Sequence, residues 1–339
     1  MNKKIVVIGP GSWGTALSQV LVDNGHEVRL WGNDRKQIEE IITKHTNETF
    51  LPNIVLPEAI QGYYDLEEAM KGVDTVLIVV PTKAFRPVLN ELKKIVSIPL
   101  TIIHASKGIE PGTSKRITEV IGDEMPNELV KDIVVLSGPS HAEEVILRQP
   151  TTVTSASTNI KAAEAVQDLF MNKYFRVYTN NDVIGVEIGA ALKNIIALGA
   201  GMCDGLGYGD NAKAALITRG LAEISRLGCD MGANPLTFAG LSGVGDLIVT
   251  CTSPHSRNWR VGNQIGKGEQ LETILENMGM VAEGVRTAEA AHEMAIRLNV
   301  QMPITTAIYE VLFNGRNPRE AVDQLMSRGG KNEVNSFVR

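Results

Sequence analysis

The sequence predicts an α/β fold in two parts, a doubly wound sheet at the N-terminus followed by an all-helical domain. Three observations predict it. A glycine pattern follows the first apolar run, strand-like and helix-like runs alternate up to about residue 181, and helical segments dominate afterwards. The expected bounds are residues 1–181 for the sheet domain, 182–328 for the helical domain, and 329–339 for a mobile polar tail.

The glycine pattern Gly9-Pro10-Gly11-Ser12-Trp13-Gly14 is the most informative feature of the chain. It lies between a strand-like run at residues 5–8 and a helix-like run at residues 15–24. Glycines at this spacing allow a sharp turn, close approach of the backbone to a pyrophosphate, and tight packing of helix on strand. We therefore expect Gly9, Gly11 and Gly14 to bind a dinucleotide on a Rossmann-type sheet. A glycine-rich turn without a ligand is the alternative.

The rest of the sheet is predicted from short apolar runs bounded by polar residues or proline. The expected strands cover residues 27–31, 75–80, 100–104, 133–137, 151–155 and 175–178, with helices at 35–45 and 84–95. Ligands bind beyond the carboxyl ends of such strands. This rule selects the loops Pro81-Thr82, Ser106-Lys107-Gly108 and Gly138-Pro139-Ser140-His141, and it places Asn33 and Asp34 near an adenosine ribose. An ordinary loop is an equal alternative for Pro81-Thr82.

Composition excludes several classes of protein. The chain has 339 residues, 43% of them hydrophobic, so it can bury a large core. Its net charge of -6 argues against a nucleic-acid partner. The three cysteines are widely spaced and the histidines form no metal-spaced pair, which predicts a reducing compartment and no metal site. Because the N-terminal apolar run is too short for a secretory signal, we expect a cytoplasmic protein.

Residues 183–203 form the most apolar stretch of the helical domain. Glu187 and Lys193 lie within it, and no basic residues flank it, so a deeply buried helix is expected rather than a membrane segment. Its many small residues allow close packing. Further amphipathic helices are expected at residues 213–227, 287–298, 304–314 and 318–326.

Lys193 is the predicted catalytic residue. A lysine in an apolar helix either extends its ammonium to a wet edge or lies in a pocket where desolvation lowers its pKa. Beside a dinucleotide that delivers hydride, the second kind can protonate the oxygen of a ketone. Asn194 and Asp246 are expected to orient the lysine or to hold a substrate hydroxyl. For Asp246 a helix N-cap is an equal alternative.

Ser256-Arg257-Asn258 is a candidate anion site, because it places a hydroxyl, a guanidinium and an amide on successive residues. Arginine matches the oxygen geometry of phosphate bidentately. The alternative is an exposed turn, which such a tripeptide by itself usually forms. Together with a cationic loop at Lys107, the tripeptide favours a phosphorylated substrate.

The chain resembles the bacterial NAD(P)-dependent glycerol-3-phosphate dehydrogenases, and the shared motifs span nearly its whole length. The motifs are GPGSWGTAL at 9–17, SKG at 106–108, LSGPSHAEE at 136–144, VEIGAALKNIIA at 186–197, DNAKAALITRGL at 210–221, GVGDLIVTCT at 243–252, SRN at 256–258 and VAEGVR at 281–286. The resemblance implies reversible, NAD(P)H-dependent reduction of dihydroxyacetone phosphate to sn-glycerol 3-phosphate, a precursor of membrane phospholipids. It also implies a role for Lys193 as proton donor and acceptor.

The resemblance further assigns residues to the two ligands. Those implied around the substrate are Lys107, Gly138, Ser140, Asp246, Ser256, Arg257 and Asn258. Those implied around the cofactor are Ser12, Trp13, Lys107, Ala142, Arg257, Val281 and Glu283. Phe50 lies where the family often has an aromatic residue near the adenine, although packing explains it equally.

The chain departs from the family pattern at two places. Pro10 stands where alanine is usual, and Asn33-Asp34 stands where many members carry a histidine or arginine for the 2′-phosphate of NADPH. Nucleotide preference therefore stays open, as does the choice between a monomer and a homodimer. Two other functions stay in view, a dehydrogenase acting on a 3-hydroxy acid and a dinucleotide-binding redox sensor without turnover. Neither would need both Lys193 and so many anion-binding groups.

Overall fold

The computed structural model describes residues 2–278, 282–330, 332 and 333. They fall into two compact units, each with its own interior. The sheet unit contains Met1–Ser106 and Ile117–Val183, and the helical unit contains Lys107–Arg116 and Ile184–Arg339. The segment Lys107–Arg116 thus interrupts the sequence of the sheet unit but packs with the helices. The domain bounds expected from the sequence had left this segment in the sheet domain.

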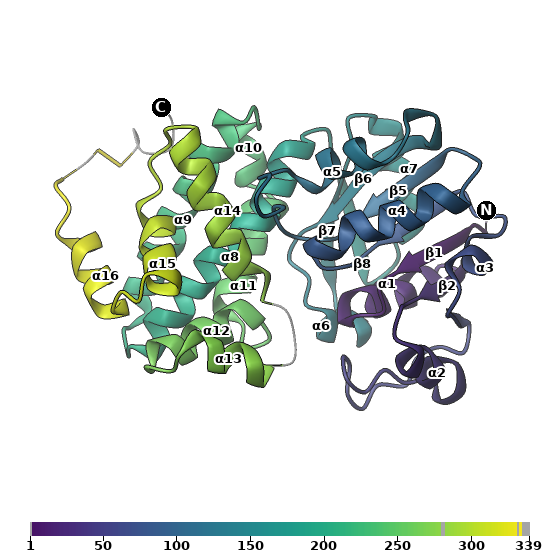
Figure 1. Cartoon of the computed structure of the whole chain (residues 1–339), viewed down its shortest axis with the longest axis horizontal. Coiled ribbons are helices and arrows are strands. Elements are labelled where there is room, and N and C mark those ends of the chain that lie inside the picture. Colours follow the sequence, from purple (N-terminus) through teal and green to yellow (C-terminus); the bar gives the residue numbers. More distant parts are fainter. Residues whose placement is uncertain (1, 279–281, 331, 334–339) are drawn as a thin grey trace. The chain divides into compact units, whose positions relative to one another are not determined.

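The sheet unit is built on one eight-stranded sheet with the order β3-β2-β1-β4-β5-β6-β7-β8 (Figure 1). The strands are β1 (Lys4–Ile8), β2 (Glu27–Trp31), β3 (Ile60–Tyr63), β4 (Thr75–Ile78), β5 (Leu100–His104), β6 (Val130–Ser137), β7 (Thr151–Ala156) and β8 (Phe175–Asn180). Neighbouring strands are parallel except β6 and β7. The chain winds outward from β1 in one direction and from β4 in the other, so the predicted doubly wound fold class is confirmed.

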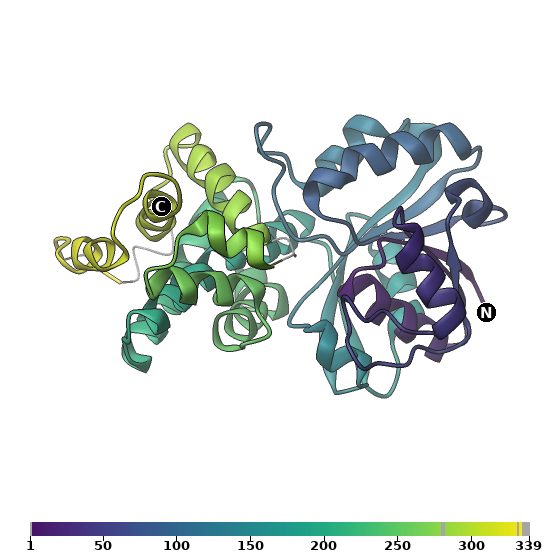
Figure 2. The same ribbon diagram turned by 60° about the horizontal axis from the view of Figure 1, so that its bottom comes forward.

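Helices cover both faces of this sheet. They are α1 (Ser12–Asp23), α2 (Arg35–Lys44), α3 (Leu66–Met70), α4 (Phe85–Ile95), α5 (Ile117–Glu124), α6 (Ala142–Ile146) and α7 (Ile160–Phe170), with 3₁₀ turns η1 (Thr82–Ala84) and η2 (Asn127–Leu129). Because successive strand residues point to opposite faces, Ile5 and Val7 pack with α1, α2, α6 and α7, whereas Val6 and Ile8 pack with α3, α4 and α5. Figure 2 shows the purple α1 and α2 on one side of the strands and the blue α4 on the other.

Several predicted boundaries differ from the structure by a few residues, and one strand, β3, was not predicted. The predicted strand at 75–80 ends at Ile78, and α1 begins at Ser12 rather than at residue 15. β3 was not predicted, because Gln61 and Gly62 interrupt its apolar character. It lies at the edge of the sheet, where pairing with β2 on one side suffices.

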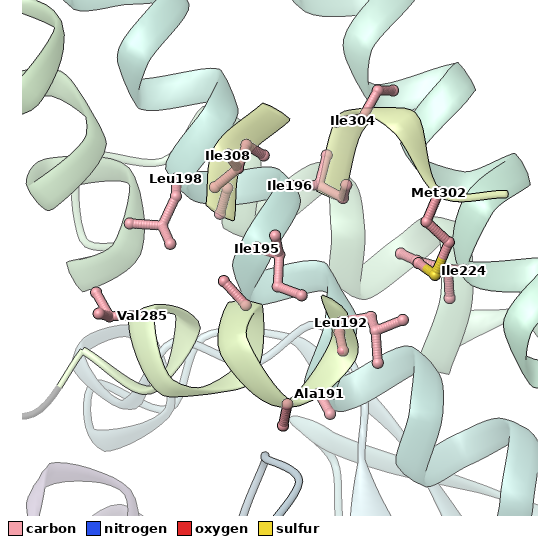
Figure 3. Close-up of a cluster of buried hydrophobic side chains, with 14 of the residues drawn as sticks. Ala191, Leu192, Ile195, Ile196, Leu198, Ile224, Val285, Met302, Ile304 and Ile308 are labelled. Atoms are coloured by element: carbon pink, nitrogen blue, oxygen red, sulfur yellow. The ribbon is translucent and has the colours of Figure 1, made fainter. Parts of the chain in front are cut away.

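The helical unit is a bundle around α8 (Val183–Gly205). Its other members are α9 (Asp210–Asp230), α10 (Pro235–Phe238), the π-helical turn η3 (Leu241–Gly245), α11 (Asp246–Thr252), α12 (Arg257–Gly266), α13 (Leu271–Met278), α14 (Glu283–Arg297), α15 (Pro303–Phe313) and α16 (Pro318–Met326). Side chains of α8, α9, α14 and α15 gather in one core, in which Leu192, Ile195 and Ile308 are buried (Figure 3).

α8 is long and apolar enough to cross a membrane by length and composition, and it alone meets that test among the described helices. Within the structure, 89% of its most apolar window is buried. Burial of this kind is typical of the central helix of a globular bundle. As for the predicted polar tail at 329–339, residues 331 and 334–339 lie outside the described part of the chain.

Candidate active site

The glycine turn between β1 and α1 has the form that a pyrophosphate requires. Gly9 has φ of +111°, and a Cβ there would lie 2.5 Å from the Val79 carbonyl oxygen. A Cβ at Gly14 would lie 2.0 Å from the Gly9 carbonyl oxygen, so this glycine lets α1 pack against the turn.

Gly11 differs from the other two glycines. Its φ of -70° suits any residue, and a Cβ there would meet no atom of the described residues within 4 Å. Neither conformation nor packing within the protein requires glycine here, yet a side chain would fill the open space beside the first turn of α1. The amides of a first helical turn lack helical partners and attract anions. These residues therefore fit the pyrophosphate of a dinucleotide.

Side-chain hydrogen bonds from Asn47 and Ser12 fix this turn. The Asn47 side chain donates to the Pro10 carbonyl oxygen at 2.8 Å and to the Thr15 hydroxyl at 3.0 Å. The Ser12 hydroxyl donates to the Phe50 carbonyl oxygen at 2.9 Å, which brings two of the predicted cofactor residues together. Trp13 is half-buried, and its Nε1 has no hydrogen-bond partner among the described residues. Asn47 was not predicted, because it lies far along the chain in an irregular segment.

Asp34 ends the turn after β2 and begins the next helix. Its Oδ1 accepts from the amides of Lys36 at 2.9 Å and Gln37 at 3.3 Å, so it is the N-cap of α2. The Arg35 guanidinium lies over the Tyr64 ring at 5.4 Å from its centroid. A cavity of about 470 Å³ opens here, lined by Asn33, Arg35 and Tyr64 but not by Asp34.

The loop after β6 and the start of α6 carry three predicted residues of the sheet unit. Gly138 has φ of +143°, and a Cβ there would lie 2.9 Å from the Val153 Cα. The Ser140 hydroxyl donates to the Gly138 carbonyl oxygen at 2.9 Å. Ala142 is buried as the first residue of α6. Close packing thus accounts for glycine at 138 whether or not a ligand binds there.

A cluster of charged side chains lies around Lys193 in the helical unit. The Lys193 ammonium donates to Asp246 Oδ1 and, at 2.8 Å, to the Thr250 hydroxyl. The Lys107 ammonium donates to the other carboxylate oxygen, Oδ2, at 3.1 Å. Lys193 and Asp246 are 5% and 0% exposed, so this is a buried carboxylate shared by two lysines. Thr250 also donates to the Asp246 carbonyl oxygen at 2.6 Å, which fixes its hydroxyl as an acceptor for Lys193.

The environment tunes Lys193 for proton exchange near neutrality. Burial lowers its pKa to about 7, and the positive charge of Lys107 acts in the same direction, while Asp246 opposes both. A lysine with this pKa can act as an acid in one direction of a reaction and as a base in the other.

Asp246 reaches Lys193 because the backbones of α8 and η3 approach closely about one helical turn before these two residues. A Cβ at Gly189 of α8 would lie 2.2 Å from the Ser242 carbonyl oxygen in η3. Gly189 precedes Lys193 by four residues, and Ser242 precedes Asp246 by four. Because four residues span about one helical turn, the contact sets the spacing of the ion pair. The N-cap alternative for Asp246 is not observed, since Asp246 is the first residue of α11 after Gly245.

The remaining predicted residues of the helical unit differ in their burial and in their hydrogen bonds. The Asn258 side chain donates to Asn194 Oδ1 at 3.0 Å and accepts from the Gly284 amide at 2.9 Å, so it joins α8, α12 and α14. Ser256 caps α12, accepting from the Trp259 amide at 3.2 Å. Arg257 is exposed at the first position of that helix. Glu283 begins α14, and the predicted cofactor residue Val281 lies outside the described residues.

The chain matches two family models over nearly its whole length. Residues 4–163 match the NAD-dependent glycerol-3-phosphate dehydrogenase N-terminus, and residues 182–323 match the C-terminus of the same family. The chain belongs to the NAD-dependent glycerol-3-phosphate dehydrogenase family. The glycerol-3-phosphate dehydrogenase [NAD(P)+] of Bacillus cereus strain B4264 is 68% identical over 334 residues, which is 98% of each chain. That of Bacillus anthracis strain CDC 684 is 67% identical over the same coverage.

A solved structure of the family shows the same fold. The glycerol-3-phosphate dehydrogenase of Coxiella burnetii is 38% identical, with a TM-score of 0.92 over 96% of this chain and 99% of that one. The predicted resemblance to glycerol-3-phosphate dehydrogenases is thus confirmed. Within the described residues no group of three or more histidine, cysteine or acidic side chains is placed to hold a metal ion.

Proposed function

We propose that this chain catalyses the reversible, NAD(P)H-dependent reduction of dihydroxyacetone phosphate to sn-glycerol 3-phosphate. The observation that carries the proposal is the buried Lys193 ammonium, held by Asp246 and Thr250 in a chain of this family. The product would supply the glycerol backbone of phospholipids. The three cysteines, none in a disulfide, support a cytoplasmic location.

We assign the dinucleotide to the sheet unit and the substrate's reacting end to the helical unit. The open space at Gly11 and the first turn of α1 support a pyrophosphate site there. Reduced nicotinamide, when bound, supplies the hydride that the carbonyl carbon of the substrate accepts. Both nucleotides are expected to work, since the carboxylate of Asp34 is occupied with capping α2.

Lys193 supplies the proton that balances the hydride. Its ammonium has three protons, and Asp246 and Thr250 accept two of them. The third is available to the carbonyl oxygen of the substrate, which gains negative charge as hydride arrives. In the reverse direction, neutral Lys193 accepts the proton of the hydroxyl group. Asp246 contacts both ammonium groups and orients Lys193.

The substrate's phosphate is assigned to the start of α12. Arg257 stands at the first position of this helix, where its guanidinium and the amides of the first turn together favour an anion. Ser256 keeps the helix start in place by capping it. The Asn258 bonds to α8 and α14 hold this helix start against Asn194, the residue next to Lys193.

A spectrophotometric assay tests the proposal. Purified protein is mixed with NADH or NADPH and dihydroxyacetone phosphate, and oxidation of the nucleotide is followed, with a 3-oxo acid as the comparison substrate. We expect oxidation of the nucleotide with dihydroxyacetone phosphate and not with the 3-oxo acid. Lys193→Ala should bind nucleotide normally but lose at least ~100-fold in turnover, the lower range for a lost general acid. Most of the turnover surviving in a folded Lys193→Ala protein would exclude this role for Lys193.

A further inference from the structure

The segment Lys107–Arg116 is fastened to the helical unit at three points. At its start, Lys107 binds Asp246. Near its start, Ile109 is 1% exposed within the core around α8. At its end, Arg116 Nη1 donates to Glu187 Oε2 of α8 at 2.7 Å, with side chains only 12% and 3% exposed.

The segment is a closed hairpin, so its two ends move together. Ile109 and Arg116 form an antiparallel bridge, and within it the Glu110 amide donates to the Lys115 carbonyl oxygen at 2.9 Å. The Ser114 amide donates to the Glu110 carbonyl oxygen at the same distance. Lys107 lies only two residues before the bridge, so its position depends on where the bridge is held.

The chain on both sides of the hairpin belongs to the sheet unit, which makes the fastening necessary. Ser106 precedes it and Ile117 follows it, both in that unit. Lys107 nevertheless completes a carboxylate site whose other members, Lys193 and Thr250, lie on helices. Without an attachment to α8, nothing in the local sequence would hold the Lys107 ammonium at Asp246.

We propose that Arg116 and Glu187 are positioning residues of the reaction, which act by holding the hairpin so that Lys107 meets Asp246. Neither residue takes part in the reaction itself. The inference rests on the proposed function for its kinetic consequence, but the attachment is a property of the chain alone.

The test uses Arg116→Gln/Glu187→Gln in the full chain. Removing both charges avoids leaving one buried charge unpaired, which would destabilise the fold on its own. We expect kcat/KM for dihydroxyacetone phosphate to fall ~10- to 100-fold, the scale of a small misplacement of a site group. The matched control is Arg86→Gln/Glu124→Gln, another Arg–Glu pair with a 2.7 Å contact, between α4 and α5. It should stay within ~2-fold of wild type.

Two further readouts separate positioning from general destabilisation. In a Lys107→Met background, the Arg116→Gln/Glu187→Gln changes should cost little more, because Lys107 carries their effect. The rate of reduction should fall at high pH as Lys193 loses its proton. In Arg116→Gln/Glu187→Gln this high-pH limb should move to higher pH, since withdrawing the charge of Lys107 raises the pKa of Lys193. The other groups acting on Lys193, Asp246 and the buried thiol of Cys251, stay in place. An equal loss in the Lys107→Met background, or an unmoved limb, would overturn the proposal.

Hydrogen exchange keeps the test independent of activity. In Arg116→Gln/Glu187→Gln the amides of Glu110 and Ser114 should exchange faster than in wild type, whereas the control variant should not change them. If wild-type protein failed to reduce dihydroxyacetone phosphate, the proposed function would fall, and this exchange would still decide whether the ion pair holds the hairpin. Unchanged exchange would show that it does not.

Discussion

Lys193 illustrates how burial changes the acidity of a single side chain. Its side chain lies in an apolar helix with one carboxylate and one hydroxyl as partners, and burial lowers its pKa to about 7. In water the same ammonium would remain charged well above neutral pH and would rarely release a proton.

The two directions of the reaction should therefore respond oppositely to pH. Reduction needs the ammonium form of Lys193, so its kcat should fall as pH rises through about 7. Oxidation needs the neutral form, so its kcat should rise over the same range. Steady-state rates measured in both directions from pH 6 to 9, with saturating ligands, check this expectation. Parallel profiles would mean that another group exchanges the proton.

Asp34 gives a second test at the scale of one residue. Because its carboxylate accepts two amides at the start of α2, Asp34→Ala should lower the free energy of unfolding by ~0.5 to 2 kcal/mol. The ratio of kcat/KM for NADPH to that for NADH should change little. Chemical denaturation and the two nucleotide assays measure these effects. An increase of more than ~10-fold in NADPH use would instead place Asp34 at the ribose.

Residue types predicted candidate site residues better than they predicted the bonds between them. Asn194 and Asp246 could be proposed from sequence as partners of Lys193, with a helix N-cap as an equal alternative for Asp246, and in the structure Lys193 donates to Asp246. Thr250 could not, because a threonine in a helix gives no signal until the helices are packed. Asn258 was expected at the substrate, yet two of its bonds serve helix packing.

At the scale of elements, backbone contact between α8 and η3 governs the ion pair. Gly189 of α8 meets the Ser242 carbonyl oxygen so closely that no side chain fits between them. An apolar helix rich in small residues predicts close packing, but the sequence does not say which neighbour comes close. Long elements such as α9 and α14 were predictable because apolar residues recur along them with the helical period. In contrast, α10, η3 and α11 are too short to show a period.

Gly189→Ala tests the contact against a matched glycine. Alanine stabilises a helix interior intrinsically relative to glycine. A Cβ at Gly122 in α5 would meet no described atom within 4 Å, so Gly122→Ala should be neutral or raise stability by up to ~1 kcal/mol. Gly189→Ala should instead lower the free energy of unfolding by ~1 to 3 kcal/mol, because the helices must separate. It should also reduce turnover, since Lys193 and Asp246 separate with them. Denaturation and kinetics of both variants, side by side, measure the difference.

At the scale of the whole molecule, the division into a sheet unit and a helical unit could be read from the change in texture near residue 182. The placement of Lys107–Arg116 could not. Its sequence is a polar loop after a strand, and only the burial of Ile109 and the partners of Lys107 and Arg116 assign it to the helices. Contacts distant in sequence decide such assignments, and local patterns do not contain them.

Two buried groups of the helical unit should give the whole chain an unusual dependence of stability on pH. Burial raises the pKa of Glu223 to about 7. The carboxyl group accepts hydrogen bonds from the amides of Ile304 and Thr305 at the start of α15, and these bonds act in the opposite direction. Its contribution to stability is therefore full at low pH and is lost as pH rises from about 4.5 to about 7. Burial lowers the pKa of Lys193 from 10.5 to about 7, so its contribution grows as pH rises from about 7 towards 10.5.

Together these two groups predict a minimum near pH 7 in their joint contribution to the free energy of unfolding. Other groups titrate as well, so the measurement is a difference between proteins. Denaturant unfolding of wild type and of Glu223→Gln/Lys193→Met, from pH 5 to 9, isolates the contribution, because neither substituted side chain carries a titratable proton. Wild type should be least stable relative to the double variant near pH 7 and should recover on both sides. A difference that stays constant with pH would show that both groups keep their ordinary pKa values in the folded protein. A lysine with its ordinary pKa would not exchange protons readily at neutral pH, so the proposed role of Lys193 would then lack its physical basis.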